Sequence, residues 1–190
     1  MSLLSQEELS GYMSVVDSVP YKERLKIKQL LELDRVQRCQ DSFLFFVQQM
    51  WPVFISGRHH KIMADAFERV ARGELKRLII NMPPRHTKSE FASYLLPAWF
   101  LGKFPQKKII QTAHTAELAV GFGRKVRNLV QSDPYLKVFK TKLSTDSKAA
   151  GRWNTEQGGD YFAIGVGGAV TGKGADILII DDPHSEQEAK

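Results

Sequence analysis

Two short stretches of this sequence carry residues suited to phosphate chemistry. In the first, apolar β-formers end in a Pro-Pro loop, and Lys88 and Ser89 follow where amphipathic sequence resumes. Phosphate-binding loops use a lysine and a hydroxyl at a helix start in this way, to hold the outer phosphates and magnesium. The match to G-x-x-x-x-G-K-[ST] is imperfect, because Met82 and Thr87 fill the two glycine positions.

The second stretch lies near the other end of the chain. Four aliphatic residues at 177–180 predict a buried parallel strand, and Asp181 and Asp182 follow at its carboxyl end, where ligands sit in open α/β sheets. Magnesium prefers carboxylate oxygen, and a second carboxylate can polarise an attacking water. Either stretch alone also fits an ordinary buried strand that is followed by polar residues. The two in this order favour an ATPase site.

Composition gives the broad class of protein. The chain has 190 residues, 43% hydrophobic and 25% charged, which fits a globular domain with its own core. We expect an intracellular protein without a membrane partner, because no apolar run approaches the ~20 residues of a membrane span and the N-terminus does not resemble a signal peptide. Cys39 is the only cysteine, which excludes an internal disulfide and fits a reducing compartment.

Positive charge is concentrated in the middle of the chain. Residues 85–140 hold ten Lys/Arg against three Asp/Glu, and the net charge is +6. Arg124, Lys125 and Arg127 form a basic cluster on a predicted helix at 115–131. The cluster fits contact with a nucleic acid backbone, and it fits equally a solvated helix face.

The elements that position these residues predict an α/β fold in two parts. Residues 1–50 form an N-terminal helical segment, either packed on the core or, for 1–40, a partner-binding arm. Residues 51–190 form the core. Its predicted elements are a helix at 57–72, a strand at 75–81 feeding the loop, a helix at 89–101, a strand at 107–112, the helix at 115–131, an irregular stretch from 133, a hairpin at 152–166 and the strand at 177–180.

Four motifs follow one another along the chain: Met-Pro-Pro-Arg-His-x-Lys-Ser-Glu at 82–90, the helix at 116–127, Thr-Gly-Lys-Gly-Ala-Asp at 171–176 and Ile-Ile-Asp-Asp-Pro-His at 179–184. Together they resemble the N-terminal ATPase domain of the tailed-bacteriophage terminase large subunit, and the sequence is most similar to that of myoviruses of cyanobacteria. The similarity runs from about Phe43 to Glu188.

The resemblance implies a P-loop ATPase of the additional-strand type, with a mostly parallel sheet flanked by helices. Members hydrolyse ATP with Mg²⁺ to drive double-stranded DNA into a procapsid, and a nuclease domain cuts the DNA. The implied partners are DNA, the portal protein, the terminase small subunit and further copies in a homo-oligomeric ring on the portal. The implied location is the host cell cytoplasm, transiently on the viral procapsid.

The resemblance also implies residue roles. Lys88 holds the β and γ phosphates, Ser89 and Asp181 hold the metal, and Asp182 activates water where most relatives have Glu, with Glu186 and Glu188 as alternatives. The implied catalytic residues are Asp182, Lys88, Arg85 and, as a residue reaching a neighbouring subunit, Lys173. The implied nucleotide-binding residues are Pro83, Pro84, Arg85, His86, Thr87, Lys88, Ser89 and His60, where His60 reads the adenine edge. His59 and His60 equally fit the capping of a helix start.

The sequence departs from the family pattern in three ways. Thr87 replaces a glycine where φ is expected to be positive, and Asp182 is one methylene shorter than Glu. The chain also stops at Lys190, so by resemblance the later strands, the coupling motif and the nuclease are absent. We therefore expect a fragment with an exposed apolar sheet edge, whose partner is the missing C-terminal part. A non-hydrolysing nucleotide- or DNA-binding fragment and a helicase-like DNA translocase remain as alternatives.

Overall fold

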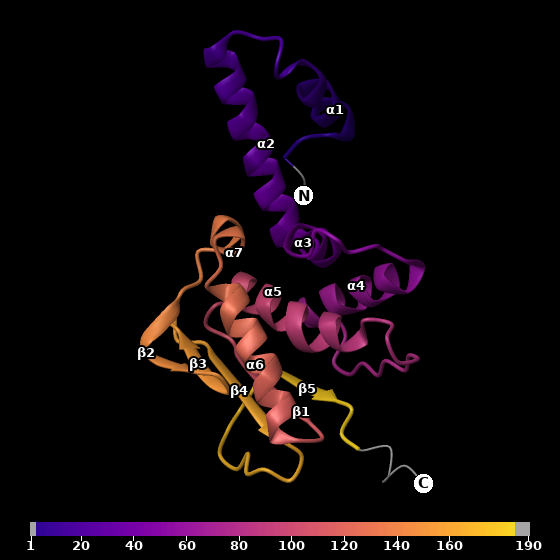
Figure 1. The fold of residues 1–190 in the computed structure, drawn as a ribbon, viewed down its shortest axis with the longest axis vertical. Helices are drawn as coiled ribbons and strands as arrows, with labels where there is room; N and C mark the ends of the chain where they lie inside the picture. The colour runs from indigo at the N-terminus through magenta and orange to yellow at the C-terminus, as the bar shows by residue number, and fades with distance from the viewer. Residues whose placement is uncertain (1–2, 185–190) are drawn as a thin grey trace. The chain divides into compact units, whose positions relative to one another are not determined.

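A computed structural model describes residues 3–184, apart from the side chains of residues 147 and 148 (Figure 1). Its contacts divide the chain into two compact units, residues 1–65 and 66–190. The division at residue 50 expected from the sequence stays a prediction. Within the described residues, no helix is both long enough and apolar enough to cross a membrane.

The first unit is helical, as predicted. Ser5 and Glu8 form a reciprocal capping box at the start of its first helix. Ser42 separates the second and third helices, because its side chain accepts a hydrogen bond from the Phe45 amide at 3.4 Å and so caps the third. Buried Asp34 accepts from the Leu4 amide at 3.1 Å, which ties the start of the chain to the second helix. The helices are α1 (Gln6–Val15), α2 (Tyr21–Asp41), α3 (Phe43–Met50) and α4 (Arg58–Ala71), the last of which continues into the second unit.

The second unit is built on a five-stranded mixed sheet in the order β2-β3-β4-β1-β5. Strand β1 pairs in parallel with β4 and β5, whereas β3 pairs antiparallel with β2 and β4. The α/β class is confirmed, and the parallel arrangement is restricted to β4-β1-β5. The elements are the π-helix η1 (Glu90–Leu95), α5 (Leu96–Lys103), β1 (Lys108–Ala113), α6 (Ala116–Val130), α7 (Asp133–Val138), β2 (Leu143–Ala149), β3 (Arg152–Thr155), β4 (Asp160–Gly165) and β5 (Ile177–Asp181).

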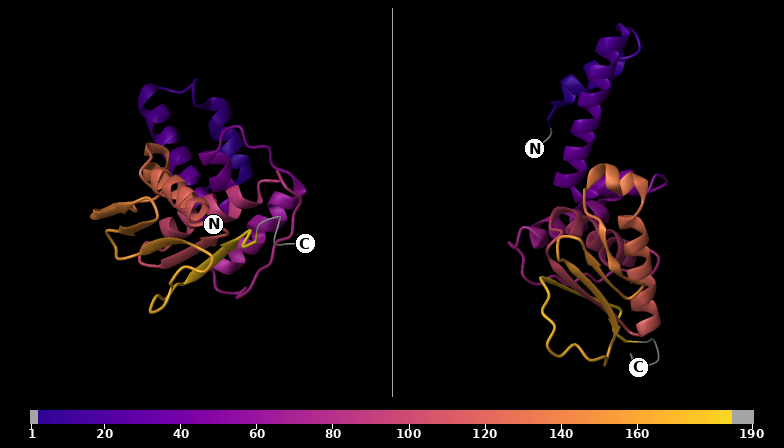
Figure 2. Two further views of the ribbon diagram at one scale, coloured as in Figure 1. Left: turned by 60° about the horizontal axis from the view of Figure 1, so that its bottom comes forward. Right: turned by 90° about the vertical axis from the view of Figure 1, so that its left-hand side faces the viewer.

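Helices cover one face of this sheet. Helix α6 packs on β1 and β4, and η1 packs on α6 and β5 (Figure 2). Gly123 allows the close approach of α6, since a Cβ there would lie 2.5 Å from the Ala150 carbonyl oxygen and 3.0 Å from the Tyr161 ring. On β5, Ile177, Ile179 and Asp181 are buried, whereas Leu178 and Ile180 are each 59% exposed. The strand predicted to be buried is therefore buried on one face only. Strand β5 ends the strand order of the described sheet, and its two exposed apolar residues lie on the open face.

Strand β1 holds β5 at both ends. At the start, Asp176 accepts from Lys107 Nζ at 2.7 Å and from the Lys108 amide at 2.8 Å. The hydrogen bond from Lys107 holds the pKa of the Asp176 carboxyl below its usual range. At the other end, the His114 amide donates to the Asp182 carbonyl oxygen at 3.2 Å. The carboxyl end of β5 is thereby fixed beside the end of β1.

Two predictions about the elements are wrong. Residues 75–81 form no strand, and Ile79 is 86% exposed, because no described strand pairs with this segment and a strand needs a partner for its backbone groups. The stretch from Asp133, expected to be irregular, instead contains α7 and β2. Pro134 fits the first turn of α7, where its missing N–H costs nothing.

Candidate active site

The two motifs predicted to carry chemistry meet at the carboxyl end of β5. Lys88 Nζ donates a hydrogen bond to Asp182 Oδ1 and lies 3.8 Å from Asp181 Oδ1. Ser89 Oγ donates to Asp181 Oδ1 at 3.1 Å. Residues more than 90 positions apart in sequence therefore form one cluster of an ammonium, a hydroxyl and two carboxylates.

The two carboxylates lie in different surroundings. Asp181 is 7% exposed, and both of its oxygens accept hydroxyl hydrogen bonds, because Ser93 Oγ donates to Oδ2 at 2.9 Å. The Asp182 side chain is 72% exposed, and its backbone has a φ of 40°. A buried, oriented carboxylate suits the holding of an ion, and an exposed one suits contact with solvent and substrate.

The helix after the loop is wider than an α-helix over η1. The amide of Leu96 bonds to the carbonyl of Phe91, five residues earlier. Pro97 explains this widening, since it has no N–H for the Ser93 carbonyl and its ring would clash with that carbonyl in an α-helix. No role was predicted for Ser93, although its position four residues after Ser89 places both hydroxyls on one side of the helix.

The loop between Pro84 and Lys88 contains two residues in the left-handed region. Arg85 has a φ of 64° and Thr87 a φ of 63°. The Thr87 hydroxyl donates to the His86 carbonyl oxygen at 2.6 Å. A β-branched residue at positive φ is strained by about 1–3 kcal/mol. The positive φ expected at Thr87 from the glycine position is confirmed.

We predict that Thr87→Gly relieves this backbone strain and makes the folded protein slightly more stable. Glycine adopts positive φ freely but loses more entropy on folding, so the expected net gain in stability is small, about 0–2 kcal/mol. The matched control is Thr87→Ala, which also removes the hydroxyl but keeps the Cβ and should not gain. Chemical denaturation of the three proteins checks the order, and a Thr87→Gly protein less stable than Thr87→Ala would contradict it.

The other predicted site residues make different contacts within the described part of the chain. His60 lies in the first unit, where its Nδ1 accepts from the Gly57 amide at 2.8 Å, which is the capping interaction. Burial, followed by the neighbouring His59, lowers the pKa of His60. The Lys173 ammonium lies 4.1 Å from the ring centroid of Phe162 on β4. Pro83, Pro84, Arg85 and His86 are exposed in the loop, and Glu186 and Glu188 lie outside the described residues.

Ser89 and Asp181 are the candidate ligands for a magnesium ion. The described residues contain no group of three or more His, Cys, Asp or Glu side chains placed to hold a metal. Magnesium commonly binds through one or two protein oxygens, with water and substrate phosphates completing its shell. The Ser89 hydroxyl and the Asp181 carboxylate, 3.1 Å apart, fit that pattern.

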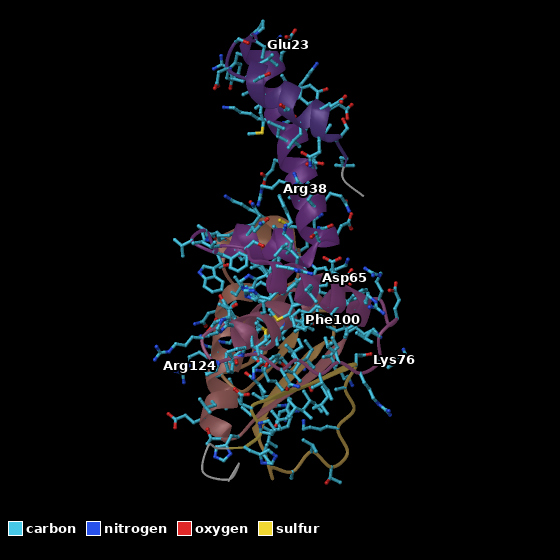
Figure 3. The ribbon with its side chains drawn as sticks, turned by 90° about the vertical axis from the view of Figure 1, so that its right-hand side faces the viewer. Glu23, Arg38, Asp65, Lys76, Phe100 and Arg124 are labelled. Atoms are coloured by element: carbon cyan, nitrogen blue, oxygen red, sulfur yellow. The ribbon has the colours of Figure 1, made fainter. Side chains whose placement is uncertain are left out.

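The basic cluster lies on α6. Lys125 pairs with Glu90 of η1 at 2.6 Å, so this lysine connects α6 to the helix that follows the loop. Arg127 bonds to the neighbouring Asn128 side chain, and Arg124 points away from the ribbon (Figure 3). Arg124 and Lys125 are both exposed, and the solvated-face interpretation remains open for all three residues of the cluster.

The fold and the site define an α/β protein with a lysine, hydroxyl and carboxylate cluster at the carboxyl end of parallel strands. A curated protein similar to it is "Terminase, large subunit" of Enterobacteria phage T3, 25% identical over 151 residues, or 77% of this chain. This similarity supports a relationship with terminase large subunits. The chain spans 26% of the length of that relative. No protein-family model matches the chain, and no solved structure gives a significant match.

Proposed function

We propose that this chain is the P-loop ATPase domain of a viral DNA-packaging motor of the terminase large-subunit type. The observation that carries the proposal is the contact of Lys88 and Ser89 with Asp181 and Asp182 across more than 90 residues of sequence. An ordinary buried strand followed by polar residues would not explain why a lysine and a hydroxyl contact two carboxylates at its end. The similarity to the phage T3 protein supports the same assignment.

The loop residues would bind the triphosphate of ATP. The Lys88 ammonium would leave Asp182 and pair with the β and γ phosphates, while the backbone N–H groups of residues 85–89 would surround them; Pro83 and Pro84, which have no N–H, would shape the start of the loop. Ser89 and Asp181 would hold Mg²⁺. The ion, when bound, neutralises phosphate charge. Arg85, in the same loop, would add a second positive charge at the phosphates.

Asp182 would orient and deprotonate the attacking water. Its exposed carboxylate is held by Lys88, and exchange of Lys88 to the phosphates would release it for this role. The His114 amide fixes its backbone, so the side chain projects from a defined point. Lys173 and His60 are proposed, on the resemblance alone, for contact with a neighbouring subunit's nucleotide and with adenine.

The proposed partners follow from the motor assignment. Double-stranded DNA would be contacted through its phosphates, with Arg124 as the first candidate, so binding should weaken with salt and ignore sequence. The portal protein, the terminase small subunit, the remainder of a large subunit and further copies in a ring are proposed as well. The proposed location is the host cytoplasm and, during packaging, the procapsid.

Magnesium-dependent ATP turnover, measured with and without duplex DNA, tests the proposal. Turnover that requires Mg²⁺ and rises with DNA supports it. Binding of ATP without turnover would favour the second candidate, a non-hydrolysing module. The strained Thr87 and the short Asp182 side chain are the observations that favour this candidate. Strand separation of duplex DNA would favour a helicase-like translocase.

A further inference from the structure

Ser93 is a buried hydroxyl aimed at the candidate metal carboxylate. It is fully buried on η1, and its Oγ donates to Asp181 Oδ2 at 2.9 Å. Hydrogen bonds from hydroxyls to carboxylates are stronger than those between neutral groups. Ser93 therefore makes a charge-assisted bond beside the cluster, from a residue outside the phosphate-loop pattern.

The bond has a geometric consequence for Asp181. The terminal torsion of an aspartate is intrinsically broad, so a free carboxylate has no fixed orientation. Ser93 holds Oδ2, and the other oxygen, Oδ1, then faces Ser89 Oγ at 3.1 Å and Lys88 Nζ at 3.8 Å. The hydrogen bond from Ser93 to Oδ2 therefore fixes the direction in which Oδ1 faces the phosphate loop.

The backbone of η1 places Ser93 where its hydroxyl can bond to Asp181. The π-helix places Ser93 one turn after Ser89, on the same side of the helix, and Pro97 imposes that widening because it cannot bond to the Ser93 carbonyl. The Ser93 hydroxyl therefore lies on the side of the helix that faces β5, where it donates to Asp181. Its side chain has a fixed position relative to β5.

We infer that Ser93 is a positioning residue that orients Asp181 to hold Mg²⁺. The inference rests on the proposed function, and it adds a residue that the phosphate-loop motif does not contain. Ser93 acts through the Asp181 carboxylate and does not touch the nucleotide. Loss of such a supporting hydrogen bond typically weakens metal binding about 10- to 100-fold.

The test is the dependence of nucleotide binding on Mg²⁺ in the 190-residue chain. A fluorescent ATP analogue is titrated with and without the metal, and the Mg²⁺ concentration that gives half of the metal-dependent change is measured. In Ser93→Ala this concentration should rise about 10-fold or more, while the affinity for the metal-free analogue stays unchanged. Ser93→Cys, which keeps the volume but is a weaker donor, should lie between Ser93→Ala and wild type.

Thr141→Ala is the matched control. Thr141 is also a buried hydroxyl of the second unit, but it donates to the Leu101 carbonyl oxygen at 3.2 Å. Its loss should lower the melting temperature without changing the Mg²⁺ requirement. The control therefore separates the loss of a buried hydrogen bond from the loss of carboxylate orientation.

The outcomes distinguish the two proposals. If wild type binds the analogue with a Mg²⁺ effect and neither Ser93 variant shifts it, the role of Ser93 is overturned and the proposed function stands. If Ser93→Cys and Ser93→Ala weaken binding equally with and without Mg²⁺, the residue is structural and the inference is overturned. If wild type shows no Mg²⁺ effect, the proposed function fails, and the role of Ser93 fails with it.

Discussion

Replacing Lys88 with alanine should remove nucleotide binding almost completely. The ammonium lies at the end of the loop and is held in place by Asp182, so it is already at the site where phosphate charge would arrive. Hydrogen bonds to charged groups contribute about 1.5–3 kcal/mol, and the loss of the upper figure lowers affinity about 100-fold. Equilibrium binding of ATP to Lys88→Ala and wild type measures the effect.

The control for this substitution is Lys107→Ala. Lys107 also pairs with an aspartate, Asp176, at 2.7 Å, but it lies at the opposite end of β5. Lys107→Ala should cost some stability and leave ATP affinity within about threefold of wild type, because exposed ion pairs contribute little. Equal affinities in Lys88→Ala and wild type would show that Lys88 does not face the phosphates.

Changing Asp182 to asparagine should separate binding from turnover. Asparagine tolerates positive φ as well as aspartate does, so the backbone at φ 40° is retained. The variant frees Lys88 from its carboxylate partner, and ATP affinity should be equal to or higher than that of wild type. Turnover should fall about 100-fold or more, because asparagine cannot accept the proton of the attacking water.

Asp146→Asn provides the matched carboxylate control. Asp146 is exposed on β2, and the hydrogen bond from Ser144 lowers the pKa of its carboxyl. Neutralising it should change neither binding nor turnover. Steady-state hydrolysis at the wild-type rate by Asp182→Asn would assign the activation of water to another group.

The sequence predicted the parts of the fold that depend on local pattern. The helix predicted at 115–131 is α6, and the Thr115 hydroxyl caps it by accepting from the Leu118 amide at 3.2 Å. The strands β1 and β5 were located by their β-branched runs. The pairing of Lys88 and Ser89 with the two aspartates was expected because the two motifs are parts of one kind of site.

The features that were missed depend on tertiary partners. Leu78 and Ile79 have the composition of a strand, yet without a pairing strand the segment stays irregular and Ile79 is exposed. The alternation of buried and exposed residues on β5 reflects which face the helices cover, and a run of four aliphatic residues cannot reveal that. Ser93 was missed because its role depends on contact with Asp181, 88 positions away in the chain.

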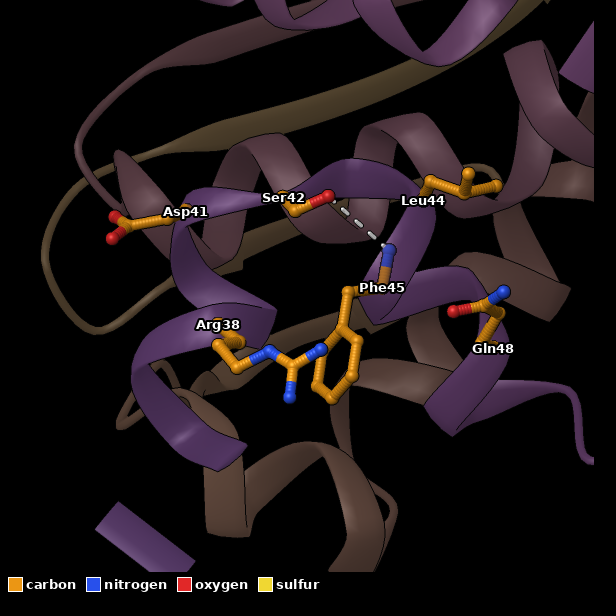
Figure 4. A pocket seen from close by; sticks show the side chains of 6 residues that line it. All are labelled: Arg38, Asp41, Ser42, Leu44, Phe45 and Gln48. Carbon is orange, nitrogen blue, oxygen red and sulfur yellow. Dashed lines mark hydrogen bonds between the residues drawn. The ribbon is translucent and has the colours of Figure 1, made fainter. Parts of the chain in front are cut away.

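The first unit also holds a feature that sequence alone did not indicate. A shallow pocket there is lined by residues of α2 and α3 and of the turn between them (Figure 4). The Arg38 guanidinium lies 4.0 Å from the ring centroid of Phe45 on one side of it. This contact joins α2 to α3 across Ser42, which ends one helix and caps the next.

Equilibrium binding of ATP to the unmodified 190-residue chain, measured in Mg²⁺ and again in excess chelator, tests most directly whether the two motifs form one site. Saturable binding that tightens with Mg²⁺ is expected, because Ser89 and Asp181 lie within 3.1 Å of each other beside the lysine. Binding that is absent, or that is equally strong without the metal, would contradict a shared nucleotide and magnesium site at the end of β5.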